Sequence, residues 1–452
     1  MRTYEVRTFG CQMNKHDSER IAGMLESHGL AAAPPHQSAD VVVFNTCCVR
    51  ENADDRLYGQ VSSLATLHRE GRCVIAVGGC IGQRDGADLL RTLPHIDVVF
   101  GTHNLAMLPQ LIDAASHTPR PLVEVGGPAE GDFTSHLPSR RERRWHAWIP
   151  IAVGCDNHCT YCIVPRVRGP ERSRPFADIV GEVERLAADG VVEVTLLGQN
   201  VNSYGRDLYG EPRFAQLLID VAATGMERIR FTTSHPKDLS PVTIEAMATT
   251  PQVCRHLHLP LQSGSDRVLA AMNRRYTGDS YLDLVRRLKD AMPDLALTTD
   301  IIVGFPGETD IDFDQTLRVV REARFDQAFT FIYSPRQGTP AAEMSSQVPK
   351  DVTQPRFDRL VEQVQSLALE NNLKLIGSRQ RVLVEGPSRR DSAMMVGRTG
   401  ANKVVHAALK DEATARAMAG RFVDVTIDDA QTWFLMGTLN PEPDPPVPTR
   451  SS

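Results

Sequence analysis

Six short apolar runs, separated by segments long enough for a helix, occupy the middle of this 452-residue chain. β-Branched and aromatic residues are frequent in these runs, which are WIPIAV, VVEVTLL, RIRFTTS, HLHLPL, LALTTDIIVGF and AFTFIY. Strands that alternate with helices pair in parallel, because each helix carries the chain back to the start of the next strand. We therefore predict a partial (β/α) barrel over residues 141–373, with its site at the carboxyl ends of the strands.

The segments on either side of the barrel have different periodicities. Residues 1–116 alternate strand patterns at 3–9, 40–45, 73–77 and 97–100 with helix patterns at 18–28 and 52–69, which predicts a doubly wound parallel sheet. Residues 117–140 are rich in Pro, Gly, Ser and charge and are predicted to be a linker. Short strands over 374–438 predict a small antiparallel β-barrel, and 439–452 are predicted to be a disordered tail. The chain is thus of the α/β class.

The nine cysteines bear on both the compartment and the chemistry of the chain. The sequence begins without the pattern of a secretory signal and has no apolar run near the ~18 residues that suggest a membrane span, so we expect a cytoplasmic protein with no membrane contact. Thiols stay reduced there, so an odd number of cysteines indicates metal ligation rather than disulfides. Cys73 and Cys254 lie in strand-like apolar surroundings and are predicted to be structural.

Cys155, Cys159 and Cys162 form the spacing CxxxCxxC directly after the first strand of the barrel series. Three thiolates on one short loop hold three irons of a cubane and leave the fourth iron without a protein ligand. Such an iron chelates S-adenosylmethionine and passes it an electron, which generates a 5′-deoxyadenosyl radical. The alternative is a zinc knuckle with His158 as fourth ligand, although closed zinc sites favour CxxC spacing. We name the three cysteines as the catalytic residues.

A second group of cysteines is dispersed through the first 116 residues. Cys11, Cys47 and Cys80 each follow a predicted strand, and the carboxyl ends of parallel strands share one edge of a sheet. We therefore expect the three thiols to converge and to hold a second cluster with its own open iron. Cys48 is an alternative to Cys47, and three unrelated core thiols are the alternative to a cluster.

Several motifs along the chain resemble those of the methylthiotransferases, a radical S-adenosylmethionine family, over nearly the whole length. They are TFGCQMNKHDSE, NTCCVRENA, GCDNHCTYCIVPRVRGPERSRP, LLGQNVNSYG, HLPLQSGS and DIIVGFPGET. The resemblance implies an N-terminal methylthiotransferase domain, a radical barrel and a C-terminal TRAM domain. The sequence departs from the family pattern at Arg166, where an aromatic residue is expected.

The resemblance also implies an activity. It assigns Cys155, Cys159 and Cys162 to a radical 4Fe-4S cluster and the dispersed group to an auxiliary 4Fe-4S cluster. One S-adenosylmethionine would donate a methyl group, and a second would supply the radical that abstracts hydrogen from carbon 2 of an N6-dimethylallyladenosine beside the tRNA anticodon. An aromatic C–H bond has no useful acidity at neutral pH, so a radical cofactor suits this step. We expect a monomer that takes electrons from a flavodoxin or a ferredoxin.

Loops that follow the other barrel strands are candidates for contact with S-adenosylmethionine. Alternative roles are turns for the glycines and a helix cap for Ser265. The candidates are Tyr161, Gly198, Gln199, Asn200, Gln262, Ser263, Gly304 and Glu308.

Basic residues outnumber acidic residues between positions 374 and 403, although the net charge of the chain is −6. A basic face on a small β-barrel predicts contact with the phosphates of the anticodon stem-loop, and a solvated charged surface is the alternative. The candidates are Arg379, Arg381, Arg389, Arg390, Arg398 and Lys403.

Three other functions compete with tRNA methylthiolation at dimethylallyladenosine. The first is the same chemistry on an aspartate of a ribosomal protein. An acidic face on the C-terminal barrel would favour that basic protein substrate, whereas a basic face favours RNA. The second is methylthiolation of threonylcarbamoyladenosine in tRNA, which the residues of the motifs disfavour. A non-catalytic, metal-stabilised RNA-binding protein would hold zinc without sulfide.

Overall fold

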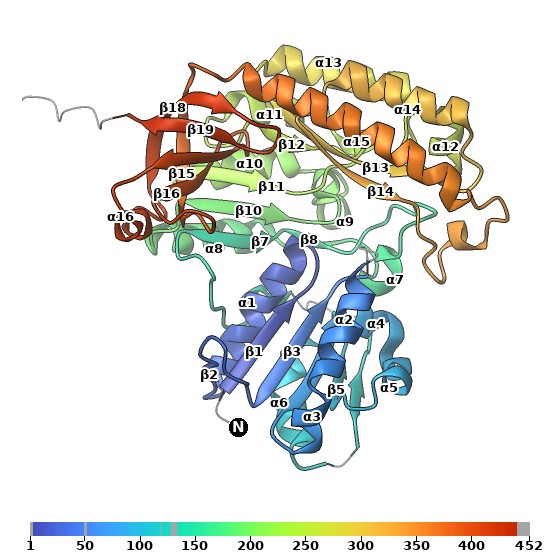
Figure 1. Ribbon diagram of the computed structural model, residues 1–452, viewed down its shortest axis with the longest axis vertical. Coiled ribbons are helices and arrows are strands. Elements are labelled where there is room, and N and C mark those ends of the chain that lie inside the picture. The colour runs from blue at the N-terminus through green and yellow to red at the C-terminus, as the bar shows by residue number, and fades with distance from the viewer. Residues whose placement is uncertain (1–2, 49–51, 119, 128–132, 441–452) are drawn as a thin grey trace, which may run out of the picture.

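The computed structural model describes residues 3–48, 52–118, 120–127 and 133–440. Three domains follow one another along the chain, and the parallel barrel lies between the N-terminal domain and the C-terminal β-barrel (Figure 1). The α/β class is confirmed. Within the described residues, no helix has the length and apolar character needed to cross a membrane.

The N-terminal domain is a six-stranded, all-parallel sheet with the strand order β2-β1-β3-β4-β5-β6. Apolar residues fill the central strands because helices cover both faces, which confirms the doubly wound sheet. The strands are β1 (Thr3–Thr8), β2 (Ala31–Ala32), β3 (Val41–Thr46), β4 (Val74–Gly79), β5 (Val98–Phe100) and β6 (Leu122–Glu124). The helices are α1 (Gln12–Ser27), α2 (Asn52–Ser63), α3 (Ala65–Arg69), α4 (Cys80–Asp85), α5 (Leu89–Thr92) and α6 (Leu108–Ala115).

Three details of this domain differ from the sequence prediction. Helix α1 begins six residues before position 18, because its buried first turns carry polar residues such as Asn14 and Asp17 and show no apolar period. The helix predicted over 52–69 is divided at Leu64 into α2 and α3. Residues 122–124, inside the predicted linker, form β6 at the edge of the sheet, and Arg140 at its end pairs with Glu26 of α1.

The central domain contains the six predicted strands, and the strands of its two three-stranded sheets, β11-β10-β7 and β12-β13-β14, pair in parallel. A parallel bridge joins Ile229 of β11 to Val253 in the segment just before β12, so β7 and β14 are the two edges of a partial barrel. The strands are β7 (His146–Pro150), β10 (Glu193–Leu197), β11 (Arg228–Phe231), β12 (His256–His258), β13 (Ala296–Val303) and β14 (Gln327–Ile332).

Helices pack on the outside of these strands, and small elements carry the loops. The larger helices are α8 (Phe176–Ala188), α10 (Phe214–Ala223), α11 (Pro241–Thr249), α13 (Gly278–Ala291), α14 (Asp310–Ala323) and α15 (Lys350–Leu373). The small elements are β8 (Ala152–Val153), α7 (Val164–Arg168), β9 (Arg172–Ser173), α9 (Arg206–Tyr209) and α12 (Asp266–Ala271).

The C-terminal domain is a closed five-stranded barrel with the order β15-β16-β17-β19-β18, and all its pairs are antiparallel except β17 with β19. The sequence pattern indicated the strands RVLVEG, AMMVG, KVVHAAL and FVDVTI but not the last strand, at 435–439. Residues 441–452 of the predicted tail lie outside the described residues. The elements are β15 (Arg379–Pro387), β16 (Met394–Thr399), β17 (Val404–Ala408), α16 (Glu412–Ala417), β18 (Phe422–Ala430) and β19 (Leu435–Leu439).

Two buried arginines of β11 fix this barrel to the central domain. Arg230 donates to Glu193 of β10 at 2.8 Å and to the main-chain carbonyls of Thr399 and Gly400 at 2.8 and 3.3 Å. Arg228 donates to the carbonyls of Arg398 and Arg381 at 2.9 and 3.2 Å. These arginines lie at the amino ends of the strands, so the opposite rim of the central barrel stays open toward the N-terminal domain.

Candidate functional site

Cys11, Cys47 and Cys80 follow β1, β3 and β4, and the structure brings their sulfurs together as the strand order predicts. The thiol of Cys47 lies in the middle and hydrogen-bonds to the sulfurs of Cys11 and Cys80. These hydrogen bonds raise the pKa of Cys47, lower the pKa of Cys11 to about 6 and hold the pKa of Cys80 well below its usual range. Thiolates are the form that binds metal, so the group is suited to ligation.

Two glycines allow these loops to approach one another. Gly10 has φ +137°, and a Cβ there would lie 2.2 Å from the Cβ of Cys47. Gly79 has φ +82°, and its Cβ would lie 2.4 Å from the carbonyl oxygen of Thr46. Any other residue would push Cys11 or Cys80 away from Cys47, so the glycines are part of the site.

Cys48 is also buried and hydrogen-bonds to Cys80, but the central position belongs to Cys47. We expect Cys47→Ala to lose about half of the iron and sulfide bound after anaerobic reconstitution, because one of two cubanes loses a ligand. Cys48→Ala is the matched control and should keep the full iron content. If Cys48→Ala lost iron and Cys47→Ala retained it, Cys48 and not Cys47 would be the cluster ligand.

The loop that carries Cys155, Cys159 and Cys162 follows β7 and β8 at the open rim of the barrel. Gly154 precedes it with φ +84° and donates its N–H to Oε1 of Gln199 at 2.6 Å, so the loop after β10 fixes the start of the cysteine loop. Burial raises the pKa of Cys155 to about 11 and that of Cys162 to about 12. Protonated thiols predominate here until a cation compensates the charge.

Residues after α12 hold the other end of this loop, and the sequence prediction missed them. Arg274 is buried and donates to the sulfur of Cys159 at 3.4 Å and to the carbonyl of Pro260 at 3.1 Å. Asn273 has φ +57° and donates to the carbonyl of His158 at 2.7 Å. Neither residue follows a strand or belongs to a cysteine motif, so no sequence signal marked them.

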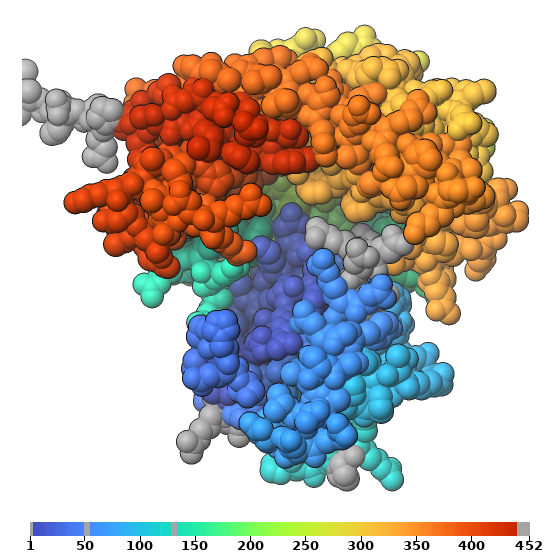
Figure 2. All heavy atoms as spheres, in the orientation of Figure 1, coloured from blue at the N-terminus to red at the C-terminus, as the bar shows by residue number. Residues whose placement is uncertain are grey.

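One cavity of about 800 Å³ lies between the N-terminal domain and the barrel, and it is lined by Cys162 and by direct neighbours of Cys11 and Cys47. Gly10 and Cys48 line it from one side, and Cys162, Gln262 and Tyr333 line it from the other. In Figure 2 the surface is recessed between the blue N-terminal domain and the orange and red segments. A molecule in this cavity therefore lies against Cys162 and against the neighbours of Cys11 and Cys47.

The candidate cofactor residues divide between this cavity and supporting contacts. Tyr161 and Gln262 line the cavity, and Gln262 has φ +69°. Asn200 donates to Asp238 at 2.7 Å, which fixes the loop after β10. The remaining candidates are placed as follows: Gly198 and Gln199 lie beside the cysteine loop, Ser263 contacts Thr316, Gly304 donates to Glu308, and Glu308 pairs with Arg356.

The donor sets fit cubanes better than single ions. No three His, Cys, Asp or Glu side chains among the described residues converge as the ligands of one metal ion, which argues against the zinc knuckle with His158. Three thiolates without a fourth protein ligand are the set taken by a cubane with one open iron. The hydroxyl of Tyr333 is buried without a hydrogen-bond partner at the cavity, and that of Ser234 is unpartnered near β11, so polar groups remain for a cofactor.

Cys73 and Cys254 lie outside both groups. Burial raises the pKa of each thiol, to about 11 for Cys73, in keeping with structural roles. Arg166, the departure from the family motif, donates to the carbonyl of Gly338 at 2.5 Å and so ties the segment after Cys162 to a loop of the barrel.

Most of the predicted RNA-binding residues form ion pairs within the chain. Arg389 and Arg390 differ, because both are exposed between β15 and β16 and pair with no acidic group among the described residues. The paired residues are Arg379 with Asp424, Arg381 with Glu227, Arg398 with Glu385 and Lys403 with Asp326.

Comparisons with known proteins agree with these three domains. Residues 149–320 match the radical SAM superfamily, residues 3–101 match the uncharacterised protein family UPF0004, and residues 373–439 match the TRAM domain. A protein of Acidothermus cellulolyticus named tRNA-2-methylthio-N(6)-dimethylallyladenosine synthase is 53% identical over 440 residues, which cover 96% of this chain and 87% of that protein. The chain belongs to this synthase family.

Other members of the synthase family match at similar identity, and a relative from Mycobacterium marinum is 52% identical over 96% of this chain and 83% of its own length. Solved structures extend the likeness at the level of the fold. The radical S-adenosylmethionine methyltransferase TsrM of Kitasatospora setae, solved with cobalamin and a 4Fe-4S cluster, has a TM-score of 0.53 at 15% identity and covers 75% of this chain and 74% of that chain. At this identity the likeness concerns the fold alone.

Proposed function

We propose that this chain transfers a methylthio group to carbon 2 of N6-dimethylallyladenosine beside the anticodon of tRNA, with S-adenosylmethionine as methyl donor and radical source. The observation that carries the proposal is one cavity lined by Cys162 of the loop and by Gly10 and Cys48, the neighbours of Cys11 and Cys47. When bound there, two 4Fe-4S clusters supply the electron that starts radical chemistry and the site from which sulfur is transferred. The protein residues hold the substrate between them.

Residues of the barrel rim are suited to hold S-adenosylmethionine near Cys162. Tyr161 and Gln262 border the cavity, and the unpartnered hydroxyl of Tyr333 is available to a polar group of the cofactor. The other candidates support this rim: Gly198, Gln199 and Asn200 brace the cysteine loop, while Ser263, Gly304 and Glu308 fix the loops after β12 and β13.

The apolar part of the cavity suits the modified base. Phe331, Ile332 and Phe357 line it together, and Phe331 on the edge strand β14 is 38% exposed. Bases of an anticodon loop can be turned out and stacked on aromatic side chains, and a dimethylallyl group gains free energy from apolar contact. These side chains are therefore our candidates for receiving the substituted adenine.

Arg389 and Arg390 are our primary candidates for RNA phosphates, because the other basic candidates are occupied by carboxylates. We expect the double variant Arg389→Ala/Arg390→Ala to bind tRNA roughly tenfold more weakly at moderate salt and with a smaller salt slope. Arg379→Ala, which removes a paired arginine of the same barrel, should change tRNA affinity by less than about twofold. Fluorescence titration with labelled tRNA measures both, and equal losses would contradict the assignment.

Three further proposals concern the setting of the reaction. Asp156 and His158 are exposed on the Cys155 loop, which gives a flavodoxin or ferredoxin an approach to the radical cluster. One chain supplies both cysteine groups, so we infer that a monomer is competent. The proposed tRNA substrate and the free cysteines support a cytoplasmic reaction.

The deciding experiment uses the anaerobically reconstituted chain, S-adenosylmethionine, a reductant and three substrates. They are tRNA with N6-dimethylallyladenosine, the same tRNA without the dimethylallyl group, and an aspartate-bearing ribosomal protein. Mass spectrometry of digested RNA and protein should find the methylthio group on the first substrate. Modification of the ribosomal protein instead would overturn the proposal.

A further inference from the structure

A short segment of the barrel domain joins the two cysteine groups. Helix α7 begins two residues after Cys162 and ends at Arg168 beside the N-terminal domain. Its apolar residues Ile163 and Val167 are buried in the core that contains Cys80 and Ile81, and Thr102 donates to the carbonyl of Val167 at 2.7 Å. The end of α7 is therefore fixed against the loops of the dispersed cysteines.

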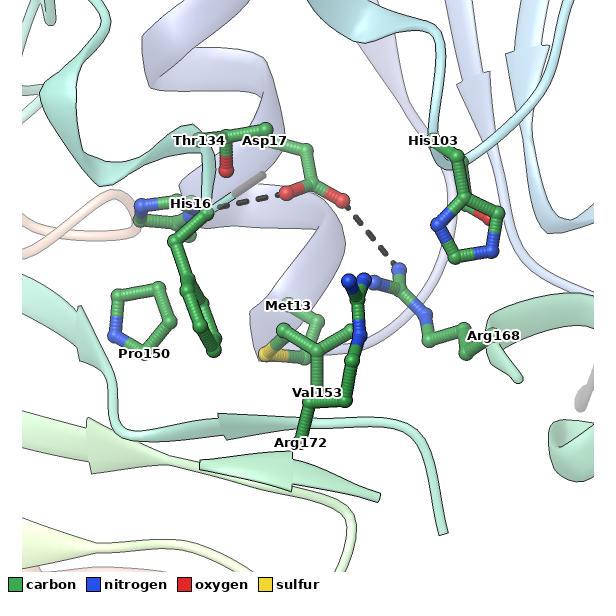
Figure 3. Close-up of a pocket in the computed structure, with 11 residues that line it drawn as sticks. Met13, His16, Asp17, His103, Thr134, Pro150, Val153, Arg168 and Arg172 are labelled. Atoms are coloured by element: carbon green, nitrogen blue, oxygen red, sulfur yellow. Dashed lines mark hydrogen bonds and ion pairs between the residues drawn. The ribbon is translucent and has the colours of Figure 1, made fainter. Parts of the chain in front are cut away.

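Arg168 occupies the point of contact between α7 and the dispersed cysteines. Its side chain is 7% exposed, donates to Oδ2 of Asp17 at 3.2 Å and lies within hydrogen-bonding reach of the sulfur of Cys80. Figure 3 shows Asp17 of α1 between Arg168 on one side and His16 on the other. The barrel domain thus places the permanent positive charge of Arg168 beside Cys80 of the N-terminal domain.

A buried chain of hydrogen bonds fixes the orientation of this arginine. Arg20 can only donate, so its Nε–H at 3.3 Å makes Nε2 of His16 the acceptor. The ring hydrogen of His16 then lies on Nδ1 and is donated to Oδ1 of Asp17 at 3.3 Å. Asp17 is held from both sides and leaves the remaining N–H groups of Arg168 for the sulfur.

We propose that Arg168 is a positioning residue for the auxiliary cluster, which orients Cys80 and raises the reduction potential of that cluster. The inference rests on the proposed function in one respect, namely that Cys11, Cys47 and Cys80 hold a cluster. A reduced cluster is more negative than an oxidised one, so a nearby cation favours the reduced state, and hydrogen bonds to the sulfurs act in the same direction. Low exposure limits the screening of this charge by water.

The test measures the auxiliary cluster alone. The full-length chain with Cys155→Ala/Cys159→Ala/Cys162→Ala is reconstituted, and its midpoint potential is followed by EPR-monitored redox titration. Adding Arg168→Gln should shift the midpoint to more negative values at unchanged iron content. Arg168→Lys should shift it less, because the charge is retained without the planar fork.

Arg174→Gln is the matched control, because Arg174 is equally buried near the same interface but pairs with Glu182 and the carbonyl of Pro150. It should leave the midpoint unchanged. An unchanged midpoint in folded Arg168→Gln would overturn the inference. Failure of the chain without the barrel cysteines to hold any cluster would overturn the auxiliary cluster itself and the inference with it.

A second measurement does not depend on the folding of the Arg168 variants. The chain lacking the barrel cysteines is prepared with 15N-labelled arginine, and pulsed EPR of the reduced cluster records nitrogen couplings. A hydrogen-bonded guanidinium should give a 15N coupling, and Arg174→Gln should preserve it. Absence of this coupling in a reduced, fully loaded cluster would contradict the contact between Arg168 and the cluster.

Discussion

Cys159→Ala should abolish methylthiolation and the formation of 5′-deoxyadenosine together. Cys159 is the most buried of the three loop cysteines and accepts a hydrogen bond from Arg274, so no water or neighbouring side chain can take its place as ligand. Carbon 2 of adenine offers no acidic hydrogen, and no base in the cavity can replace radical chemistry. We expect a loss of roughly a thousandfold or more, measured by chromatography of both products.

Cys254→Ala is the matched control for this loss, because Cys254 is also a buried cysteine of the barrel but lies outside the loop. Its small cavity should cost about 1 kcal/mol of stability and leave activity within about twofold. Cys159→Ala should still bind about half of the iron, through the N-terminal cysteines. If Cys159→Ala still formed 5′-deoxyadenosine, the cysteine loop would not be the site of radical generation.

Arg230→Ala should cause a large loss of stability, because Arg230 is buried, pairs with Glu193 and donates to the C-terminal barrel. The change leaves Glu193, whose side chain is 9% exposed, with only Arg228 at 3.7 Å. It also removes a donor from the carbonyls of Thr399 and Gly400. Removal of one partner from a buried ion pair typically costs about 3–5 kcal/mol. Chemical denaturation, followed by proteolysis between α15 and β15, should show early release of the C-terminal barrel.

Arg379→Ala is the control for this result, because its pair with Asp424 is exposed. Exposed pairs contribute about 0–1 kcal/mol, so the midpoint of denaturation should scarcely move. Equal midpoints for the two variants would show that other contacts, such as Lys403 with Asp326, hold the barrel in place.

The convergence of the dispersed cysteines could be predicted from the sequence, because each of them follows a predicted strand of a parallel sheet. Cys11, Cys47 and Cys80 each follow a strand, and the parallel sheet brings them together as expected. The amino end of α1 escaped prediction, because a helix face buried through polar contacts has no apolar period. Residues 122–124 escaped as well, because a three-residue edge strand in a Pro- and Gly-rich segment resembles a linker.

The candidate site was predictable where it lies on one element and not where it joins two domains. The cysteine loop follows β7 as expected, whereas Arg168 and Arg274 act on cysteines that are 88 and 115 residues away in sequence. Contacts of this kind depend on how domains pack, and a single sequence carries no periodicity that reports them. The ion pairs of Arg379 and Lys403 likewise involve partners that are distant in the sequence, so they could not be predicted from it.

Arg228 and Arg230 hold the C-terminal barrel mainly by its main-chain carbonyls, and Arg228 also lies over the ring of Phe422 at 4.6 Å. Every amino acid offers such a carbonyl, so most substitutions in these strands leave the joint intact. Substitutions in the outer loops of this barrel can therefore change its contacts with RNA. They leave the distance between this barrel and the cavity at the cysteines unchanged.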